Sequence, residues 1–452
     1  MKLTYPGPLE AVSIPSLGLT VKRGGSADVP DEAAPQLLDQ GWQAVPEKSP
    51  TSTTKKAAPA ATKEPCPMAL GSGMAAQIGY GVESTPGTVV TPTIFVPLRS
   101  ETLTDDRERL ESEAIIAGRR VLDDDMWNGG NATVGGGVQH DLYDRGIGSL
   151  FKAMFGGVST TGSGPYTHTF TPADLTDNSL TVQKGVPDLA GTVHPMTFAG
   201  SFVTSWEIAV AQGAIASLGL TFACMGSETG SRALADGVTT NADATVTSAG
   251  GAFTAADVGK SISGTGIPAG ATIVTINSST SVEISAAATV DGTGVALVVG
   301  KALASASYAS GAKPVKFNHG HVLIGGSAVN VKSATVAGDN GLATDRRYIG
   351  SKNIAAPKEA ALRAYTGSLD VDFDDLTQYN RYLAGDTFAL VLGFTVGTYS
   401  LTITQNSRYE PGQTPQVGGT GIVGQSLGYK SLGSTDAAAI TAVLVNGDST
   451  VA

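Results

Sequence analysis

Charged residues, aromatic residues and cysteines are all scarce in this sequence of 452 residues. Asp, Glu, Lys and Arg together make up 15% of the chain and aromatic residues 6%, whereas glycine occupies 58 positions. With only Cys66 and Cys224 available, a framework of disulfides is excluded, and we expect a reducing compartment at the time of folding. The alternation of apolar residues around Cys224 predicts that its thiol is buried.

Signals for membranes and for nucleic acid are missing as well. The sequence has no uncharged apolar run long enough for a membrane span, and its start, MKLTYPGPLE, lacks the pattern of a signal peptide. The net charge is −11, and residues 68–231 carry 8 Lys or Arg against 17 Asp or Glu. A protein that binds nucleic acid tightly needs a cationic patch, so we expect no specific DNA binding. Because no apolar run could span a membrane, we expect a soluble protein without membrane binding.

Motifs that could carry catalysis are incomplete. Residues 424–428, GQSLG, match the nucleophile elbow of hydrolases, but there the histidine follows the serine, and the last histidine here, His321, precedes Ser426. A glycine turn is the preferred interpretation. Residues 319–321, HGH, have a spacing suited to zinc but no further ligand nearby, and the glycine-rich stretches lack a P-loop lysine. We therefore expect no enzyme, no catalytic residues, no metal site and no cofactor.

Four aspartates crowd the stretch LDVDFDD, residues 369–375. Side chains of a strand alternate between its faces, so Asp370 and Asp372 are predicted on a solvated face. Asp374 or Asp375 can accept hydrogen bonds from the free N–H groups at the start of a following helix. The cluster is therefore interpreted as part of a scaffold rather than as a metal or catalytic site.

The chain divides into five segments by composition. Residues 1–46 predict a small unit with a β-hairpin and a helix, and residues 47–67, rich in Pro, Thr, Ala and Lys, predict a linker. Residues 68–231 and 301–452 predict the two parts of one larger domain. Residues 232–300 are built from Thr, Ser, Ala, Val and Gly and predict a small β module inserted into that domain.

Alternation of apolar residues predicts a mainly β fold for the larger domain. Residues 198–210 and 214–224 alternate strongly and predict neighbouring strands joined by a turn near Gly213. One main helix is expected within residues 140–157, where apolar residues recur at helical spacing and Gly156 supplies a stop.

Three stretches carry a resemblance to a known family. They are residues 78–103 (IGYGVESTPGTVVTPTIFVPLRSETL), residues 115–157 (IIAGRR…GGVQHDLYDRGIGSLFKAMFGG) and residues 321–375 (HVLIGG…LDVDFDD). In order and spacing these resemble the major tail tube proteins of long-tailed, siphovirus-type bacteriophages. The resemblance covers residues 68–231 and 301–452. Residues 232–300 resemble the Thr/Ser/Ala-rich modules of phage structural proteins, and residues 1–46 resemble a small phage protein.

The resemblance implies a structural virion protein. It implies two packed antiparallel sheets, as a β-sandwich or barrel, with one flanking helix, and rings of usually six copies that stack into the tail tube through which DNA is ejected. Expected partners are further copies of the chain and the tape measure, tail terminator and distal tail proteins. DNA is expected to pass without specific binding, and assembly is expected in the host cytoplasm.

Two other classes stay open. Another virion component, such as a capsid decoration or tail terminator protein, would share a β-rich fold without stacking indefinitely. A surface-binding protein is the second alternative, because residues 232–300 could act as a binding module.

The acidic stretch at residues 100–125 is the candidate site. A channel of negative sign would repel DNA and keep it mobile. The carboxylates expected to line such a channel are Asp105, Asp106, Glu108, Glu111, Glu113, Asp123, Asp124 and Asp125. The alternative is a contact between rings, in which Arg107, Arg109, Arg119 and Arg120 pair across subunits.

Overall fold

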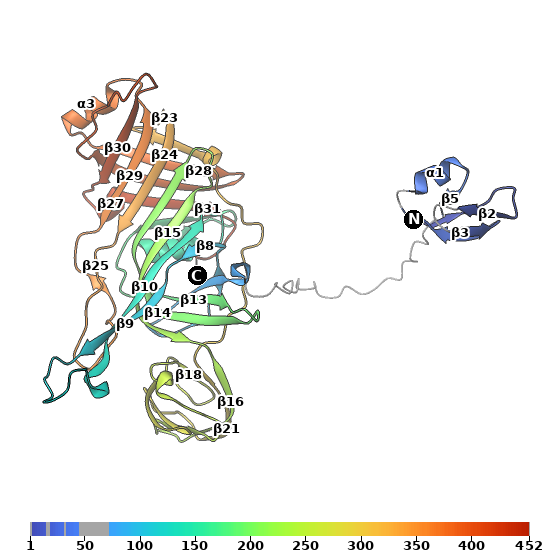
Figure 1. Ribbon diagram of the computed structural model, residues 1–452. Coiled ribbons are helices and arrows are strands. Elements are labelled where there is room, and N and C mark those ends of the chain that lie inside the picture. Colours follow the sequence, from blue (N-terminus) through green and yellow to red (C-terminus); the bar gives the residue numbers. More distant parts are fainter. Residues whose placement is uncertain (1, 15–18, 31–32, 45–71, 452) are drawn as a thin grey trace. The chain divides into compact units, whose positions relative to one another are not determined.

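The computed structural model describes residues 2–14, 19–30, 33–44 and 72–451 (Figure 1). The chain forms two compact units, residues 1–66 and residues 67–452. The linker predicted at residues 47–67 lies outside the described residues.

The first unit is small and has a core of its own. Strand β1 (Lys2–Thr4) lies between β4 (Ser26–Asp28) and β5 (Gln43–Ala44), and β2 (Ala11–Ile14) forms a hairpin with β3 (Leu19–Lys22). Helix α1 (Ala34–Asp39) supplies Leu37 to the core. The other buried residues of this core are Leu3, Tyr5, Val21, Val29, Ala34 and Trp42.

The second unit is dominated by antiparallel strands that close into a barrel. Its barrel strands are β6 (Gln77–Val82), β7 (Ile94–Phe95), β8 (Leu98–Glu101), β9 (Thr104–Glu111), β10 (Trp127–Asp141), β11 (Gly156–Thr161), β12 (Tyr166–Pro172), β13 (Leu180–Pro187), β14 (Val193–Ala211), β15 (Ser217–Thr229), β22 (Gly320–Ile324), β23 (Ser327–Val329), β24 (Val331–Asp339), β27 (Ala364–Asp372), β28 (Phe388–Val396), β29 (Tyr399–Tyr409), β30 (Gly424–Ser431) and β31 (Ile440–Asn446). The prediction of a mainly β fold is confirmed.

Seven strands lie side by side across one wall of the barrel, in the order β9-β10-β15-β14-β24-β27-β30. We call this set of strands the row. The turn between β14 and β15 is at Gly213, whose φ of +79° favours glycine, as the sequence predicts.

The other strands complete the barrel around an apolar core. Strands β7, β6, β13 and the first half of β14 pair in that order, and β23, β22, β28, β29, β31, β12 and β11 form the other run. One continuous cluster of buried side chains fills the interior, including Phe155, Phe170, Trp206 and Tyr429.

The main helix is shorter than the sequence predicts. Helix α2 covers Gly148–Phe155, and its side chains are buried except for Lys152. Gly146 has a φ of +74° and breaks the helical pattern that residues 140–147 suggest, whereas Gly156 ends the helix as expected. Two further helices lie beside the sheets: α3 (Thr377–Ala384) and α4 (Asp436–Ala439). No helix in the described part of the chain is long and apolar enough to cross a membrane.

Residues 232–299 form a separate six-stranded sheet with its own core (Figure 1). Its strands are β16 (Arg232–Thr239), β17 (Thr245–Ser248), β18 (Ile262–Ser263), β19 (Ile273–Ser278), β20 (Ser281–Ile284) and β21 (Gly292–Val299). Glu228, at the end of β15, anchors this sheet: its carboxylate accepts hydrogen bonds from the Ser261 N–H at 2.6 Å and from the Ser261 hydroxyl at 2.9 Å. Burial raises the pKa of Glu228, although these hydrogen bonds oppose the shift.

Candidate functional site

One face of the row points away from the core and carries small polar side chains. Directly paired residues in a sheet project from the same face, so the strand register identifies its members. One line across the face runs through Asp141, Ser217, Ala209, Thr335, Ser368 and Gly428. The next line runs through Gln139, Gly219, Glu207, Ala337, Thr366 and Lys430. We call this surface the open face.

The opposite face of the same strands is apolar and packed. The line between the two just described runs through His140, Leu218, Ile208, Val336, Gly367 and Tyr429, and the side chains in it are buried. Gly367 lies so close to its neighbours that a Cβ there would be 2.1 Å from the Thr335 carbonyl oxygen. The row therefore separates a packed interior from a smooth polar surface.

Carboxylates outnumber cations on the open face. Glu207 and Asp370 are exposed, while Asp372 forms an ion pair with Lys332. The predicted position of Asp370 and Asp372 on a solvated strand face is therefore confirmed. Asp375 accepts a hydrogen bond from the Thr377 N–H at the start of α3, as expected, and this bond lowers the pKa of Asp375.

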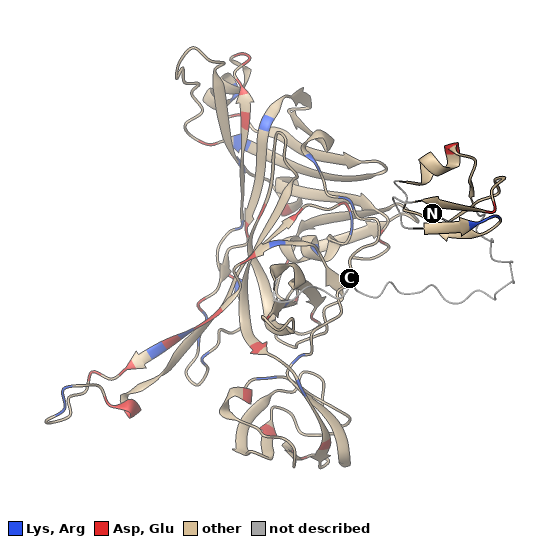
Figure 2. Cartoon of the chain, turned by 45° about the vertical axis from the view of Figure 1, so that its right-hand side comes forward, with Lys and Arg blue, Asp and Glu red and all other residues tan. Residues whose placement is uncertain are grey.

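The acidic stretch of the sequence forms a two-stranded arm. Strands β9 and β10 continue past the rest of the row as a hairpin, and residues 112–126 connect them at the tip (Figures 1 and 2). The eight candidate carboxylates all belong to β9 or to this tip. Most are exposed; Asp105 and Asp123 are half-buried. Whether any of them lines a channel stays a prediction.

Ion pairs within the arm neutralise part of its charge. Asp105 binds Arg107 at 2.7 Å and the Ser227 hydroxyl at 2.6 Å, and Asp123 binds Arg119 at 2.6 Å. Burial raises the pKa of Asp105, but the hydrogen bonds from Arg107 and Ser227 outweigh burial and hold it below its usual value. The Arg109 guanidinium lies over the ring of Trp127, 5.6 Å from its centroid.

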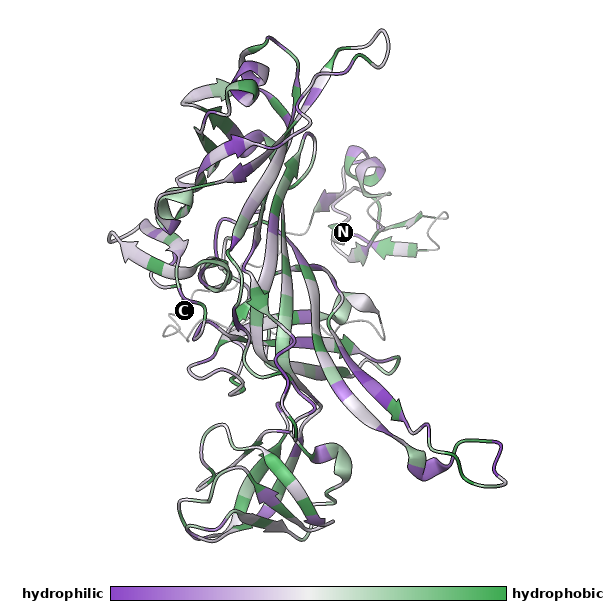
Figure 3. Ribbon diagram, turned by 90° about the vertical axis from the view of Figure 1, so that its left-hand side faces the viewer, coloured by the Kyte–Doolittle hydropathy of each residue, from purple (hydrophilic) through white to green (hydrophobic). Residues whose placement is uncertain are grey.

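The loop at the end of the arm contains hydrophobic residues (Figure 3), and large apolar side chains in and beside it are exposed. Ile115 is 94% exposed and Val121 is 78% exposed, and Leu110, Leu122 and Trp127 are also exposed. Exposed apolar side chains on a projecting element are typical of contact surfaces.

A second exposed apolar cluster lies at the other end of the row. Strand β10 begins in the arm at Trp127 and ends at Asp141, and the antiparallel register places Asp372 and Gly424 at that far end of the row. Helix α3 follows Asp372, and loop 410–423 leads into Gly424. The exposed apolar residues of this α3 end are Leu376, Leu383, Val417 and Ile422.

The comparisons with known proteins identify the family. A model of a family described as phage tail tube protein matches residues 73–283 and 269–431. The chain belongs to the phage tail tube protein family. It is therefore a structural component of the virion tail, as the resemblance in the sequence implies. No curated protein matches the chain.

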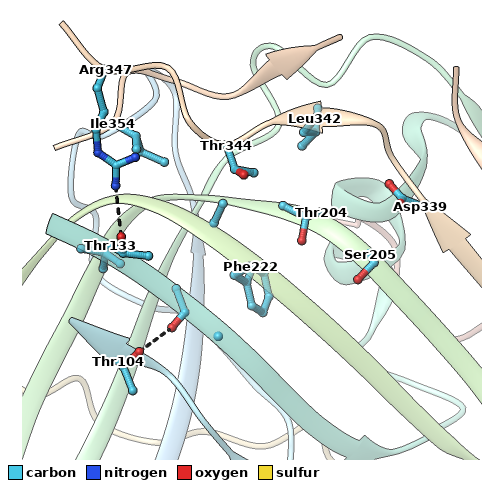
Figure 4. A pocket seen from close by; sticks show the side chains of 14 residues that line it. Thr104, Thr133, Thr204, Ser205, Phe222, Asp339, Leu342, Thr344, Arg347 and Ile354 are labelled. Carbon is cyan, nitrogen blue, oxygen red and sulfur yellow. Dashed lines mark hydrogen bonds between the residues drawn. The ribbon is translucent and has the colours of Figure 1, made fainter. Parts of the chain in front are cut away.

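The long loop at residues 340–363 accompanies the arm of this tail tube protein. Arg347 donates to the Ala132 carbonyl at 2.7 Å, and the Ala132 N–H donates to the Lys352 carbonyl at 2.8 Å. Between the loop and the row lies a hollow of about 520 Å³, and its lining includes Thr133, Thr204 and Thr344 (Figure 4). The loop exposes Tyr348 and Ile349, which extend the apolar surface at the arm end.

The motifs considered for catalysis lie in structural positions. Ser426 is in the middle of β30, so the glycine turn predicted at residues 424–428 is wrong: Gln425, Leu427 and Tyr429 alternate into the interior and make this segment a strand. His321 lies on β22 against Gly393. Cys224 is buried as predicted, and burial raises its pKa to about 12. Among the described residues, no group of three or more His, Cys, Asp or Glu could hold a metal ion.

Sequence reasoning missed the two apolar ends of this tail tube protein. The signal was present in Ile115, Ile116, Val121 and Leu122, large apolar residues inside a charged stretch without periodicity. An apolar residue in a segment that cannot be a buried strand or helix is a candidate contact residue.

Proposed function

We propose that this protein forms rings that stack into the tail tube, the conduit for DNA ejection. The observation that carries the proposal is the pair of exposed apolar clusters at opposite ends of one row of strands. A contact between two different surfaces propagates from copy to copy, because each new copy presents the same free surface again. The arm tip of one ring would contact the α3 end of a subunit in the next ring.

The open face then lines the channel. Most side chains in its two lines are Ser, Thr, Ala or Gly, and of its two cations, Lys332 and Lys430, Lys332 is paired with Asp372. Its carboxylates repel the duplex within a Debye length of roughly 8 Å. This assigns Asp370 and Glu207 to the channel wall and gives the arm the role of a ring-to-ring contact. The ends of such a tube would meet the tail terminator and distal tail proteins, with the tape measure protein inside, after assembly in the host cytoplasm.

The stacking contact can be tested by removing apolar side chains from the arm tip. A double variant, Ile115→Ser with Val121→Ser, should keep the melting temperature of the single chain and abolish long tubes in electron micrographs. The matched control is Leu189→Ser, because Leu189 is 90% exposed but lies in the turn between β13 and β14, outside both the arm and the α3 end. Tubes of normal length from the double variant would refute the arm contact.

Discrete rings of the wild-type chain that never lengthen would instead favour a tail terminator. A three-dimensional reconstruction of the tube tests the channel. The open face should border the lumen, and if it lies on the outer wall the assignment of the open face is wrong.

A further inference from the structure

The second unit contains one pattern of strand pairing twice. In the first half, β6 pairs with β7 and β13, β13 with β14, β14 with β15, β15 with β10, and β10 with β9. In the second half, β22 pairs with β23 and β28, β28 with β29, β29 with β30, β30 with β27, and β27 with β24. All the pairs are antiparallel, and corresponding strands follow in the same order along the chain.

We call β10 the central strand of the first half and β27 the central strand of the second half. The connection that follows the central strand repeats as well. Strand β10 ends at Asp141 and β27 at Asp372, and each is followed by a helix of 8 residues, α2 or α3. Both helices carry a cation in the last turn, Lys152 or Arg381. Both end at a glycine with positive φ, +94° at Gly156 and +68° at Gly385. The strand before each central strand also leads into a long loop at the same end of the row, the arm tip in one half and residues 340–363 in the other.

The two halves meet through two strand pairs, β12 with β31 and β14 with β24, and only the second pair joins strands of the repeated pattern. The last part of β14, from Ser205 to Ala211, pairs with β24 from Asp339 to Ser333. In the repeated pattern, β24 corresponds to β9 together with β8, and β14 corresponds to β29. The join within the chain therefore shows which two edges fit each other.

The equivalent edges at the outside of the chain have no strand partner in the described part of the structure. Strands β8 and β9 pair with β10 on one side only. Strand β29 pairs with β28 as far as Ser407, and its extension pairs with β30 through Tyr409 and through the Glu410 N–H, which donates to the Gly428 carbonyl at 2.9 Å. The outer edge of residues 408–413 is left without a neighbouring strand.

We propose that each chain contains two tube units and that neighbouring chains join in the ring as the two halves join within the chain. The edge at residues 408–413 of one copy would lie against β8 and β9 of the next. Pairing would cover the open edge of β8 and β9 and extend the row from chain to chain. A ring would then contain half as many chains as units, so that a ring of six units needs three chains rather than six. This inference rests on the proposed function, because it assumes that the chains form rings.

The experiment is a count of chains per ring with the full-length protein. Cryo-electron microscopy of wild-type tubes should give three-fold symmetry with six similar units around the channel. Native mass spectrometry of the Ile115→Ser, Val121→Ser variant, which we expect to stop at single rings, should give three times the mass of one chain. The reconstruction should also show β8 and β9 beside residues 408–413 of a neighbouring copy.

The outcomes distinguish a failure of the proposed chain number per ring from a failure of the proposed stacking of rings. Six chains per ring, or a different strand beside β9, would overturn it. Rings of three chains that do not stack would support it while overturning the tube. A chain that stays monomeric under all conditions would overturn both.

Discussion

The two faces of the row differ in the space that they leave around a single residue, and two glycines show this difference most clearly. In one ladder, Gly367 pairs with Tyr429 on the packed face, and Gly428 pairs with Ser368 on the adjacent line of the open face. A Cβ at Gly367 would meet the Thr335 carbonyl oxygen at 2.1 Å and the Tyr429 hydroxyl at 2.3 Å, whereas a Cβ at Gly428 would find its nearest neighbour at 3.7 Å. The same substitution should therefore have different costs at the two positions.

We expect Gly367→Ala to lower the free energy of unfolding by about 1–3 kcal/mol, because the Thr335 backbone cannot move away without disturbing the row. Gly428→Ala is the matched control and should change stability by less than about 0.5 kcal/mol. Chemical denaturation of both variants measures the difference. Equal stability of the two variants would contradict the packing described for Gly367.

Glu228 makes stability depend on pH. Burial raises its pKa in the folded chain, so the folded state binds its proton more tightly than the unfolded state. This contribution to stability is present below the ordinary glutamate pKa and is lost as pH rises through the raised value. Glu228→Gln keeps an acceptor for the Ser261 N–H and should therefore flatten the fall of stability above about pH 4.5. The measurement is the melting temperature of variant and wild type as a function of pH. The same pH dependence in both proteins would show that Glu228 does not contribute.

At the scale of elements, alternation in the sequence predicted the strands that have one buried face. β14 and β15, with the turn at Gly213, follow directly from their apolar spacing. The arm could not be predicted in this way, because nearly all residues of β9 are exposed and no period of two survives. The start of α2 was misplaced because Tyr143 continues the apolar stripe before the break at Gly146.

The sheet at residues 232–299 should fold as an independent element. Its core contains Val246, Val282 and Leu297, which are fully buried and belong to a cluster made only of residues from this sheet and its loops. We expect a fragment of residues 230–300 to show a cooperative thermal transition by circular dichroism. Replacing residues 232–300 with a short Gly/Ser linker should leave the remaining chain folded and able to form rings. Loss of ring formation in a folded deletion variant would show that the element takes part in assembly.

At the scale of the whole molecule, the sequence carried more information about the protein family than about how copies of the chain assemble. The position of Asp370 and Asp372 on a solvated strand face was predictable because alternation fixes the face of a strand. The open face as a whole was not, because it depends on pairs such as Ala209 with Thr335, which are distant in sequence. The relation between the two ends of the row depends on the same long-range register.

We expect a chain that starts at Met68 to fold and assemble like the full chain. The unit at residues 1–66 has its own core around Leu3, Leu37 and Trp42, and the barrel core draws on residues from Ile78 onward. Electron microscopy of the shortened protein should show tubes of the same channel diameter. A folded protein that forms no tubes would mean that the first 67 residues are needed for assembly.

The charge on β9 has a consequence for the timing of polymerisation. An unpaired strand edge invites premature association, and charged side chains on such an edge oppose it. Strand β9 carries Asp105, Asp106, Arg107, Glu108, Arg109 and Glu111 within its eight residues. Under the proposed assembly, two free chains that approach through this edge bring these charges together, so we expect slow nucleation. We expect growth on an existing template, where the partner surfaces are already fixed, to avoid most of that barrier, so that free subunits persist until an initiating structure is present.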